Sequence, residues 1–128
     1  MSISQDTSRG VTYLACPYTH PDPAVRVERF EKATLAAAHL IEQGLIIYSP
    51  ITMTHPIDLV LAKEGETLGS DYWVRFDEAF MEMCSGMVIL KVPGWDTSSG
   101  IRRETAWFQN AGREISFLEW EDVRRSSV

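Results

Sequence analysis

The sequence predicts an α/β protein with an open parallel sheet and helices on both of its faces. Short apolar segments of strand length alternate along the chain with longer segments in which apolar residues recur every three or four positions. The first strand, the helix after it and the second strand form a unit of the kind that joins parallel strands. Because ligands bind beyond the carboxyl ends of such strands, the expected site lies in residues 17–23, 49–56 and 93–100.

The first elements are a strand and a long amphipathic helix. Residues 11–16 are β-branched and aromatic enough for a buried strand, and the prolines in residues 17–23 end it. The helix is predicted over residues 24–43, with Gly44 after it as a natural C-cap. Its recurring apolar-face positions are Val27, Phe30, Ala33, Thr34, Ala37, Leu40 and Ile41.

The middle of the chain begins with a second strand. Residues 45–50 are apolar and end at a proline, so they predict a short strand, and residues 51–56 are its expected exit loop. Residues 57–63 suit one short helix, and residues 64–70 are an expected flexible link. Residues 51–70 therefore separate the second strand from the next long helix.

The last part of the chain alternates helices and strands again. A helix is expected over residues 71–84, with Trp73, Phe76, Phe80 and Met83 on one face. Residues 86–92 are the clearest buried strand. A helix follows over residues 99–110 and ends near Gly112, and residues 113–120 are a last strand or strand-like tail.

Length and composition indicate one domain over residues 1–128, with residues 1–10 as a flexible leader and residues 119–128 as a tail. The net charge of -6 argues against a protein that works by binding nucleic acid. No apolar segment has the length of a membrane span or the character of a signal peptide, so we expect no membrane partner and a cytoplasmic location. Cys16 and Cys84 lack metal-ligand spacing and are expected to be buried free thiols.

The densest group of polar residues follows the strand at residues 86–92. Ser98 or Ser99 can cap the next helix, whose first N–H groups, with Gly100, would then hold a phosphate or a sugar hydroxyl. Glu104 lies about one turn further on and can act as a base or nucleophile. The alternative is that the serines are only caps and that Glu104 faces solvent. Arg102 and Arg103 either pair with a phosphate or lie in solvent or at a subunit contact.

Other candidates lie elsewhere in the predicted crevice. Asp77 can reach it from the helix before the clearest strand, although a lone helical aspartate is more often solvated. Tyr13 and Tyr18 offer hydroxyl groups or a stacking face; Tyr13, in a strand, is alternatively a packing residue, and the loop residue Tyr18 is the stronger functional candidate. Three tryptophans can line a base pocket, namely Trp73, Trp95 and Trp107, and the two on helices, Trp73 and Trp107, are alternatively core residues.

The histidines have no metal-ligand spacing. His20 and His55 lie in crevice loops and can meet a phosphate or a base, whereas His39 is expected on a helix surface. The chain also has neither a P-loop nor a dinucleotide fingerprint. We therefore expect no metal and no cofactor.

The order of three motifs resembles the nucleoside 2-deoxyribosyltransferase-like family, including its nucleotide N-glycosidase branch. They are YLACPYT in the first strand, the acid in DEAFMEMCSGMVIL before the clearest strand, and DTSSGIRRE after it. The resemblance covers residues 11–115 and implies a flavodoxin-like (Rossmann-like) fold. In that family a glutamate on the helix after the fourth strand attacks C1′ of the sugar, and that residue matches Glu104.

The resemblance also assigns roles to other residues. Asp77 matches the acid near the departing base, Tyr13 matches a tyrosine that touches the sugar or the nucleophile, and residues 98–100 match the turn that recognises the 5′ end. An acid at that turn is typical of enzymes for free nucleosides and a serine of those for nucleotides. This chain has Asp96 as well as the serines, so both substrates stay open. The insert at residues 50–71 departs from the family pattern and leaves base recognition open.

The sequence thus predicts an enzyme that cleaves, by hydrolysis or transfer, the N-glycosidic bond of a nucleoside or nucleoside 5′-monophosphate. The resemblance further implies a homodimer or larger homo-oligomer. Two alternatives are a non-catalytic nucleotide-binding or sensing module and a flavodoxin-like protein-interaction domain. The enzyme requires Glu104 and Asp77 on one crevice, the sensing module requires only the 5′-end turn, and the interaction domain requires neither.

Overall fold

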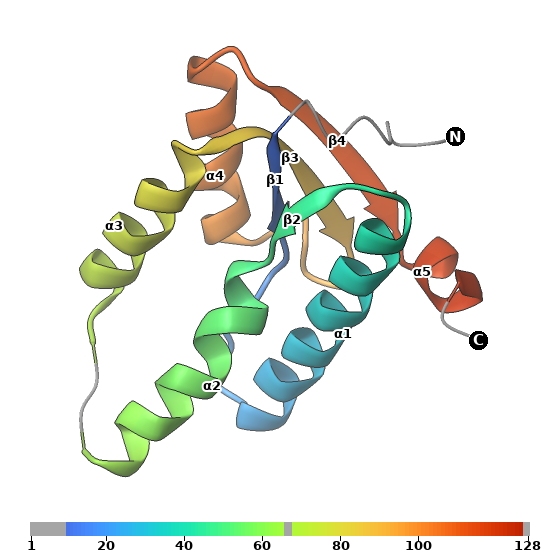
Figure 1. Cartoon of the computed structure of the whole chain (residues 1–128). Coiled ribbons are helices and arrows are strands. Elements are labelled where there is room, and N and C mark those ends of the chain that lie inside the picture. The colour runs from blue at the N-terminus through green and yellow to red at the C-terminus, as the bar shows by residue number, and fades with distance from the viewer. Residues whose placement is uncertain (1–9, 66–67, 127–128) are drawn as a thin grey trace.

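The computed structural model describes residues 10–65 and 68–126 (Figure 1). The sheet has the order β2-β1-β3-β4, and every pair of neighbouring strands is parallel. Its strands are β1 (Val11–Ala15), β2 (Ile46–Tyr48), β3 (Cys84–Lys91) and β4 (Glu114–Glu119). The predicted class, an open parallel α/β sheet in a single small domain, is confirmed.

The helices cover both faces of this sheet, as Figure 1 shows for α1 and α4. They are α1 (Pro23–Glu42), α2 (Pro50–Lys63), α3 (Ser70–Met81), α4 (Ser99–Asn110) and α5 (Trp120–Ser126). Successive strand side chains point to opposite faces. Leu14 belongs to a core cluster with α1, α2 and α5, whereas Tyr13 and Ala15 belong to a second cluster with α3 and α4.

The strand order places a crevice at the carboxyl ends of β1 and β3. From β1 the chain moves outward to β2 and then crosses back to the other side of β1 to form β3. Such a reversal of strand order separates the loops after the two central strands, which is where open α/β sheets bind ligands. Helix α4 follows β3, the third strand in the chain, whereas the family pattern places the helix of the attacking glutamate after a fourth strand.

The largest departure from the sequence prediction is α2. Residues 51–56, the expected exit loop, form its first turns, and the short helix expected at residues 57–63 is its second half. Pro50 is compatible with a first helical position because the N–H that proline lacks has no partner there in any helix. The same proline that ends the strand therefore also begins the helix.

The boundaries of α3 and β3 also differ from expectation. Helix α3 ends at Met81 and Cys84 already begins β3, so Met83 lies outside the helix and is 67% exposed. The Arg113 guanidinium, at the start of β4, donates to the carbonyl oxygens of Met81 and Cys84 at 3.0 and 2.8 Å. This contact from a distant segment helps to fix where α3 ends.

Two further expectations were wrong. The C-terminal segment, expected as a tail, forms α5 and buries Val123 in the core. His39 was expected on the surface of α1 but is buried, with its Nε2 3.2 Å from the Gln43 side-chain amide. It is one of the buried residues of α1, together with Ala36 and Leu40.

The remaining expectations concern the two cysteines, membrane spans, and the expected leader and link. Cys16 and Cys84 are buried free thiols, as predicted. No helix within residues 10–65 and 68–126 is long and apolar enough to cross a membrane. Most of the leader expected at residues 1–10 lies outside the described residues, as does part of the link expected at residues 64–70.

Candidate functional site

A cavity of about 820 Å³ opens where the sequence predicted the crevice. This volume lies in the range of roughly 300–1,000 Å³ that is typical of small-molecule sites. Each of the predicted crevice loops contributes to its lining, for example through Tyr18 after β1, Ile51 after β2 and Ser98 after β3. Helix α3 adds Trp73 and Asp77 to the same cavity.

Glu104 lies in this cavity and is only 7% exposed. It occupies the buried stripe of α4 between Ile101 and Phe108, at positions that share one face of a helix. The alternative that Glu104 faces solvent is therefore wrong. Its Oε2 accepts a hydrogen bond of 2.8 Å from the Tyr13 hydroxyl of β1, which is itself fully buried.

Burial controls the acidity of this pair. It raises the pKa of Glu104 to about 7, against the lowering effect of the Tyr13 hydrogen bond, while the nearby Asp77 raises that pKa further. Burial, together with the charge of Glu104, holds the pKa of Tyr13 well above its usual range, so its hydroxyl keeps its proton as a donor. A buried carboxyl group with a raised pKa on a cavity is typical of an active site.

Asp77 lines the cavity from α3 and is half-buried. Burial raises its pKa to about 6, the Arg103 charge lowers it, and Glu78 raises it. Nη2 of Arg103 lies 3.9 Å from the Glu104 Oε2 atom, so one cation acts on both carboxyl groups. The structure thus brings Glu104 and Asp77 to one crevice, which the predicted enzyme requires.

The start of α4 forms another part of the wall. Ser98 is the N-cap, and its Oγ accepts a hydrogen bond of 3.1 Å from the N–H of Ile101, so the predicted capping is confirmed. Ser99 and Gly100 also line the cavity. Asp96 is exposed and does not belong to the lining, so of the two candidate 5′-end groups only the serines face the cavity.

Tyr18 and His55 form a second polar contact, and His20 follows Tyr18 in the same loop. The Tyr18 hydroxyl lies 2.5 Å from the His55 Nδ1 atom, and the His55 ring stacks on Phe30 at a centroid distance of 4.5 Å. His55 is buried, and burial lowers its pKa. His20 lines the cavity, and its Nδ1 accepts a hydrogen bond from the N–H of Asp22. Of the two histidines, only His20 lines the cavity.

Sequence reasoning missed several cavity residues on α1 and α2. Arg26 and Arg29 project from one side of α1, and each donates to a carbonyl of the loop after β1, to His20 and Thr19 respectively. Asp58 lines the cavity from α2. Had Ser49 and Pro50 been recognised as a helix start, the acid on this helix could have been placed at the crevice.

Two of the three tryptophans considered for a base pocket are packing residues. Trp95 and Trp107 lie against the core cluster on the α3 and α4 side of the sheet, whereas Trp73 lines the cavity. In the described part of the chain, no three histidine, cysteine or acidic side chains are grouped as they would be to hold a metal ion.

One family profile matches this chain. Residues 10–120 match the family described as a domain of unknown function, DUF1937. No curated protein matches the chain. The matched segment contains the whole sheet together with the helices that line the cavity. The chain therefore belongs to the DUF1937 family.

Proposed function

We propose that this protein cleaves the N-glycosidic bond of a nucleoside or a nucleoside 5′-monophosphate through a glycosyl-enzyme intermediate. The observation that carries the proposal is the buried Glu104 carboxyl group, held by the Tyr13 hydroxyl on a cavity that Asp77 shares. These are the residues that match the nucleoside 2-deoxyribosyltransferase-like pattern. Their meeting in one crevice supports the resemblance independently of the motifs that suggested it.

In the first step the ionised Glu104 attacks C1′ of the sugar. Tyr13 bonds to Oε2, so Oε1 is the attacking atom, and it forms an ester bond to C1′ as the bond from C1′ to the base breaks. The electron pair of that bond leaves with the base, and Asp77 in its protonated form supplies the proton that neutralises it.

In the second step water or a second base attacks C1′ from the opposite side. The ester bond breaks and its electron pair returns to Glu104 as a carboxylate, while the Asp77 carboxylate accepts the proton of the attacking group. Both carboxyl groups then regain their starting protonation states. Hydrolysis and transfer differ only in which acceptor reaches the sugar.

The acidities of the two groups set the expected pH profile. The first step needs Glu104 ionised, which favours pH values above about 7, and Asp77 protonated, which favours values below about 6. Since the two requirements oppose each other, kcat/KM should be bell-shaped, with its maximum between these values.

The other end of the substrate is assigned to the start of α4. Ser98, Ser99 and the N–H groups beside them can bind a sugar hydroxyl or a 5′-phosphate, both of which hydrogen-bond to such helix starts. We further propose that the enzyme works in the cytoplasm and, as the resemblance implies, that it is a homodimer or larger homo-oligomer.

The test is to incubate the protein with a panel of ribo- and deoxyribonucleosides and their 5′-monophosphates and to follow the free base by chromatography. Release of base by the wild type and its loss in Glu104→Ala would support the proposal and identify the substrate class. If no substrate of the panel releases base while circular dichroism shows a folded protein, the enzymatic proposal is wrong. Ligand binding that survives in Glu104→Gln would then favour the sensing module.

A further inference from the structure

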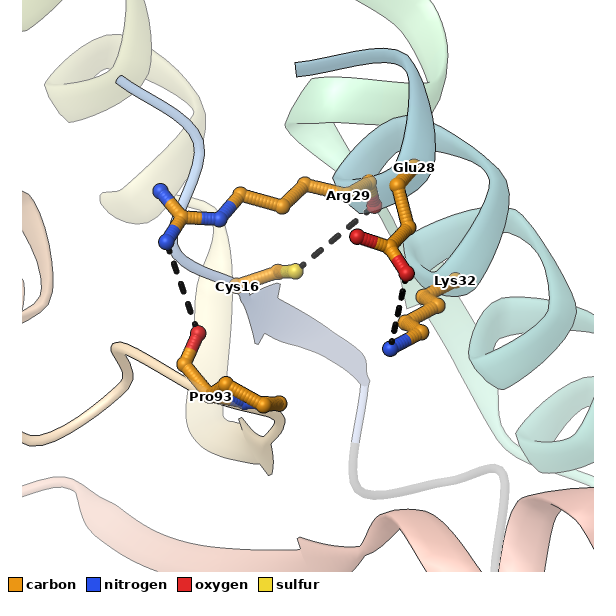
Figure 2. A network of polar contacts seen from close by, with 5 residues as sticks. All are labelled: Cys16, Glu28, Arg29, Lys32 and Pro93. Atoms are coloured by element: carbon orange, nitrogen blue, oxygen red, sulfur yellow. Dashed lines mark hydrogen bonds and ion pairs between the residues drawn. The ribbon is translucent and has the colours of Figure 1, made fainter. Parts of the chain in front are cut away.

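Arg29 on α1 reaches both of the loops that flank the central crevice, and Figure 2 shows its contact with Pro93. Its Nη1 donates to the carbonyl oxygen of Thr19, in the loop after β1, at 3.1 Å. Its Nη2 donates to the carbonyl oxygen of Pro93, in the loop after β3, at 3.4 Å. One planar guanidinium group therefore joins two segments that the chain itself connects only through α1, β2, α2, α3 and β3.

The backbone from which this side chain projects is held to the sheet. The Cys16 thiol, just beyond the end of β1, lies 3.8 Å from the carbonyl oxygen of Arg29 and 3.4 Å from that of Pro17, as a weak donor shared between them. Figure 2 shows the thiol beside α1, directed at the Arg29 carbonyl oxygen, with the Arg29 side chain extending away from the helix to Pro93. The guanidinium group thus extends from a part of α1 that packs on the sheet core.

Gly94 permits the guanidinium group to lie against the loop after β3. A Cβ atom added at Gly94 would lie 2.6 Å from Nη2 of Arg29, which is closer than such atoms approach one another. Gly94 also has a φ of +96°, where any other residue is strained. The glycine and the arginine therefore fit together, and a side chain at residue 94 would displace the guanidinium group.

We propose that Arg29 is a positioning residue that holds the start of α4 against the loop after β1. This inference rests on the proposed function, since it concerns the same site. The loop that Arg29 holds leads directly into Ser98, the N-cap of α4, and Glu104 follows on the same helix. By fixing that loop, Arg29 fixes the 5′-end turn before the substrate binds. The entropic cost of ordering the turn on binding is therefore smaller.

Two substitutions separate the shape of the arginine from its charge. Arg29→Lys keeps the positive charge, but its single side-chain nitrogen cannot replace the two guanidinium nitrogens that donate to the Thr19 and Pro93 carbonyl oxygens. Arg29→Gln removes the charge as well. Lys32→Gln is the matched control, because Lys32 lies one turn further along α1 and pairs with Glu28 of the same helix.

The glycine provides an independent route to the same contact. Gly94→Ala places an alanine at a positive φ and brings its Cβ into a clash with Arg29, whereas Gly112→Ala places an alanine at a φ of +69° with no heavy atom within 4 Å of the new Cβ. Gly112→Ala controls for the loss of overall stability that such strain causes, and the double variant Arg29→Gln/Gly94→Ala controls for strain within the loop: exchange no faster in the double variant than in Gly94→Ala reports that the arginine contact is already lost.

The experiment measures amide hydrogen exchange of residues 94–98 together with the kinetics of base release. We expect faster exchange in Arg29→Lys, Arg29→Gln and Gly94→Ala but not in Lys32→Gln or Gly112→Ala. KM should rise about tenfold, corresponding to about 1.4 kcal/mol, while kcat changes less and the pH profile keeps its midpoints. A merely structural role would lower the thermal midpoint and leave KM unchanged.

Either measurement can overturn the inference. Wild-type exchange rates in Arg29→Lys and Arg29→Gln would show that the loop does not depend on Arg29. Wild-type KM in Arg29→Lys with a raised KM in Arg29→Gln would show that charge matters rather than the fork. Should the wild type release no base from any substrate, the proposed function fails, while the exchange rates still decide whether Arg29 orders the loop.

Discussion

Replacing Glu104 with glutamine should make the protein more stable at alkaline pH. Burial raises the pKa of this carboxyl group from 4.5 to about 7, so the folded protein binds the proton more tightly than the unfolded chain does. The resulting stabilisation is complete below about pH 4.5 and is lost as the pH rises through about 7. At about 1.4 kcal/mol for each pKa unit, the rise of about 2.5 corresponds to roughly 3 kcal/mol.

Glutamine keeps the shape of glutamate and stays neutral at every pH. Its amide oxygen can still accept the hydrogen bond of the Tyr13 hydroxyl, so the substitution removes mainly the cost of burying a negative charge. Wild type and variant should therefore have similar unfolding free energies near pH 5. At pH 8 the variant should be more stable by up to roughly 3 kcal/mol.

Urea unfolding followed by tryptophan fluorescence at pH 5 and pH 8 measures this difference. The free energy of unfolding comes from the midpoint and the slope of each transition. Glu42→Gln is the control, because Glu42 is exposed at the end of α1, and it should leave the wild-type pH dependence unchanged. A gap between Glu104→Gln and wild type that is the same at both pH values would refute the reasoning from burial.

The other predictions concern substitutions of Tyr13, Asp77 and Arg113. Tyr13→Phe removes the donor that lowers the pKa of Glu104. Because the first step needs Glu104 ionised and the more acidic Asp77 protonated, the upper midpoint of the kcat/KM bell should move to higher pH and activity at pH 7 should fall about 10- to 100-fold; an unmoved upper midpoint would contradict the assigned hydrogen bond. Asp77→Asn should lower kcat by about 10²- to 10⁴-fold and abolish the alkaline limb, measured as base release between pH 5 and pH 9; retention of that limb would assign it to another group. Arg113→Gln should lower the free energy of unfolding in urea by about 1–3 kcal/mol while base release stays at the wild-type rate, because its carbonyl contacts lie at the end of α3 away from the cavity; a loss of activity without a loss of stability would refute that purely structural role.

The Arg29 contacts bear on how the substrate can be recognised. Arg26 and Arg29 line the cavity, yet both donate to loop carbonyl oxygens. Their positive charges therefore lie beside the site, while their N–H groups bind the loops that line it. The third arginine of the cavity, Arg103, lies beside the two carboxyl groups instead.

The sequence alone determined the fold class and the place of the crevice. Periodicity at residues 99–110 predicted the bounds of α4 as the structure has them, and Ser98 was among the two residues expected to cap it. These features depend on neighbours a few positions apart, so local preferences are sufficient to specify them. The same reasoning failed at Pro50, because a proline after a strand is compatible with both a loop and a helix start.

The arrangement of the site was decided by tertiary structure. Tyr13 and Glu104 are 91 positions apart, and only the pairing of β1 with β3 brings α4 over the first strand. The spacing of Ile101, Glu104 and Phe108 indicates a common face, but whether that face is buried depends on what packs against it. The contacts of Arg29 likewise join loops from opposite sides of the crevice. Contacts of this range follow from strand order and packing, which local sequence patterns do not encode.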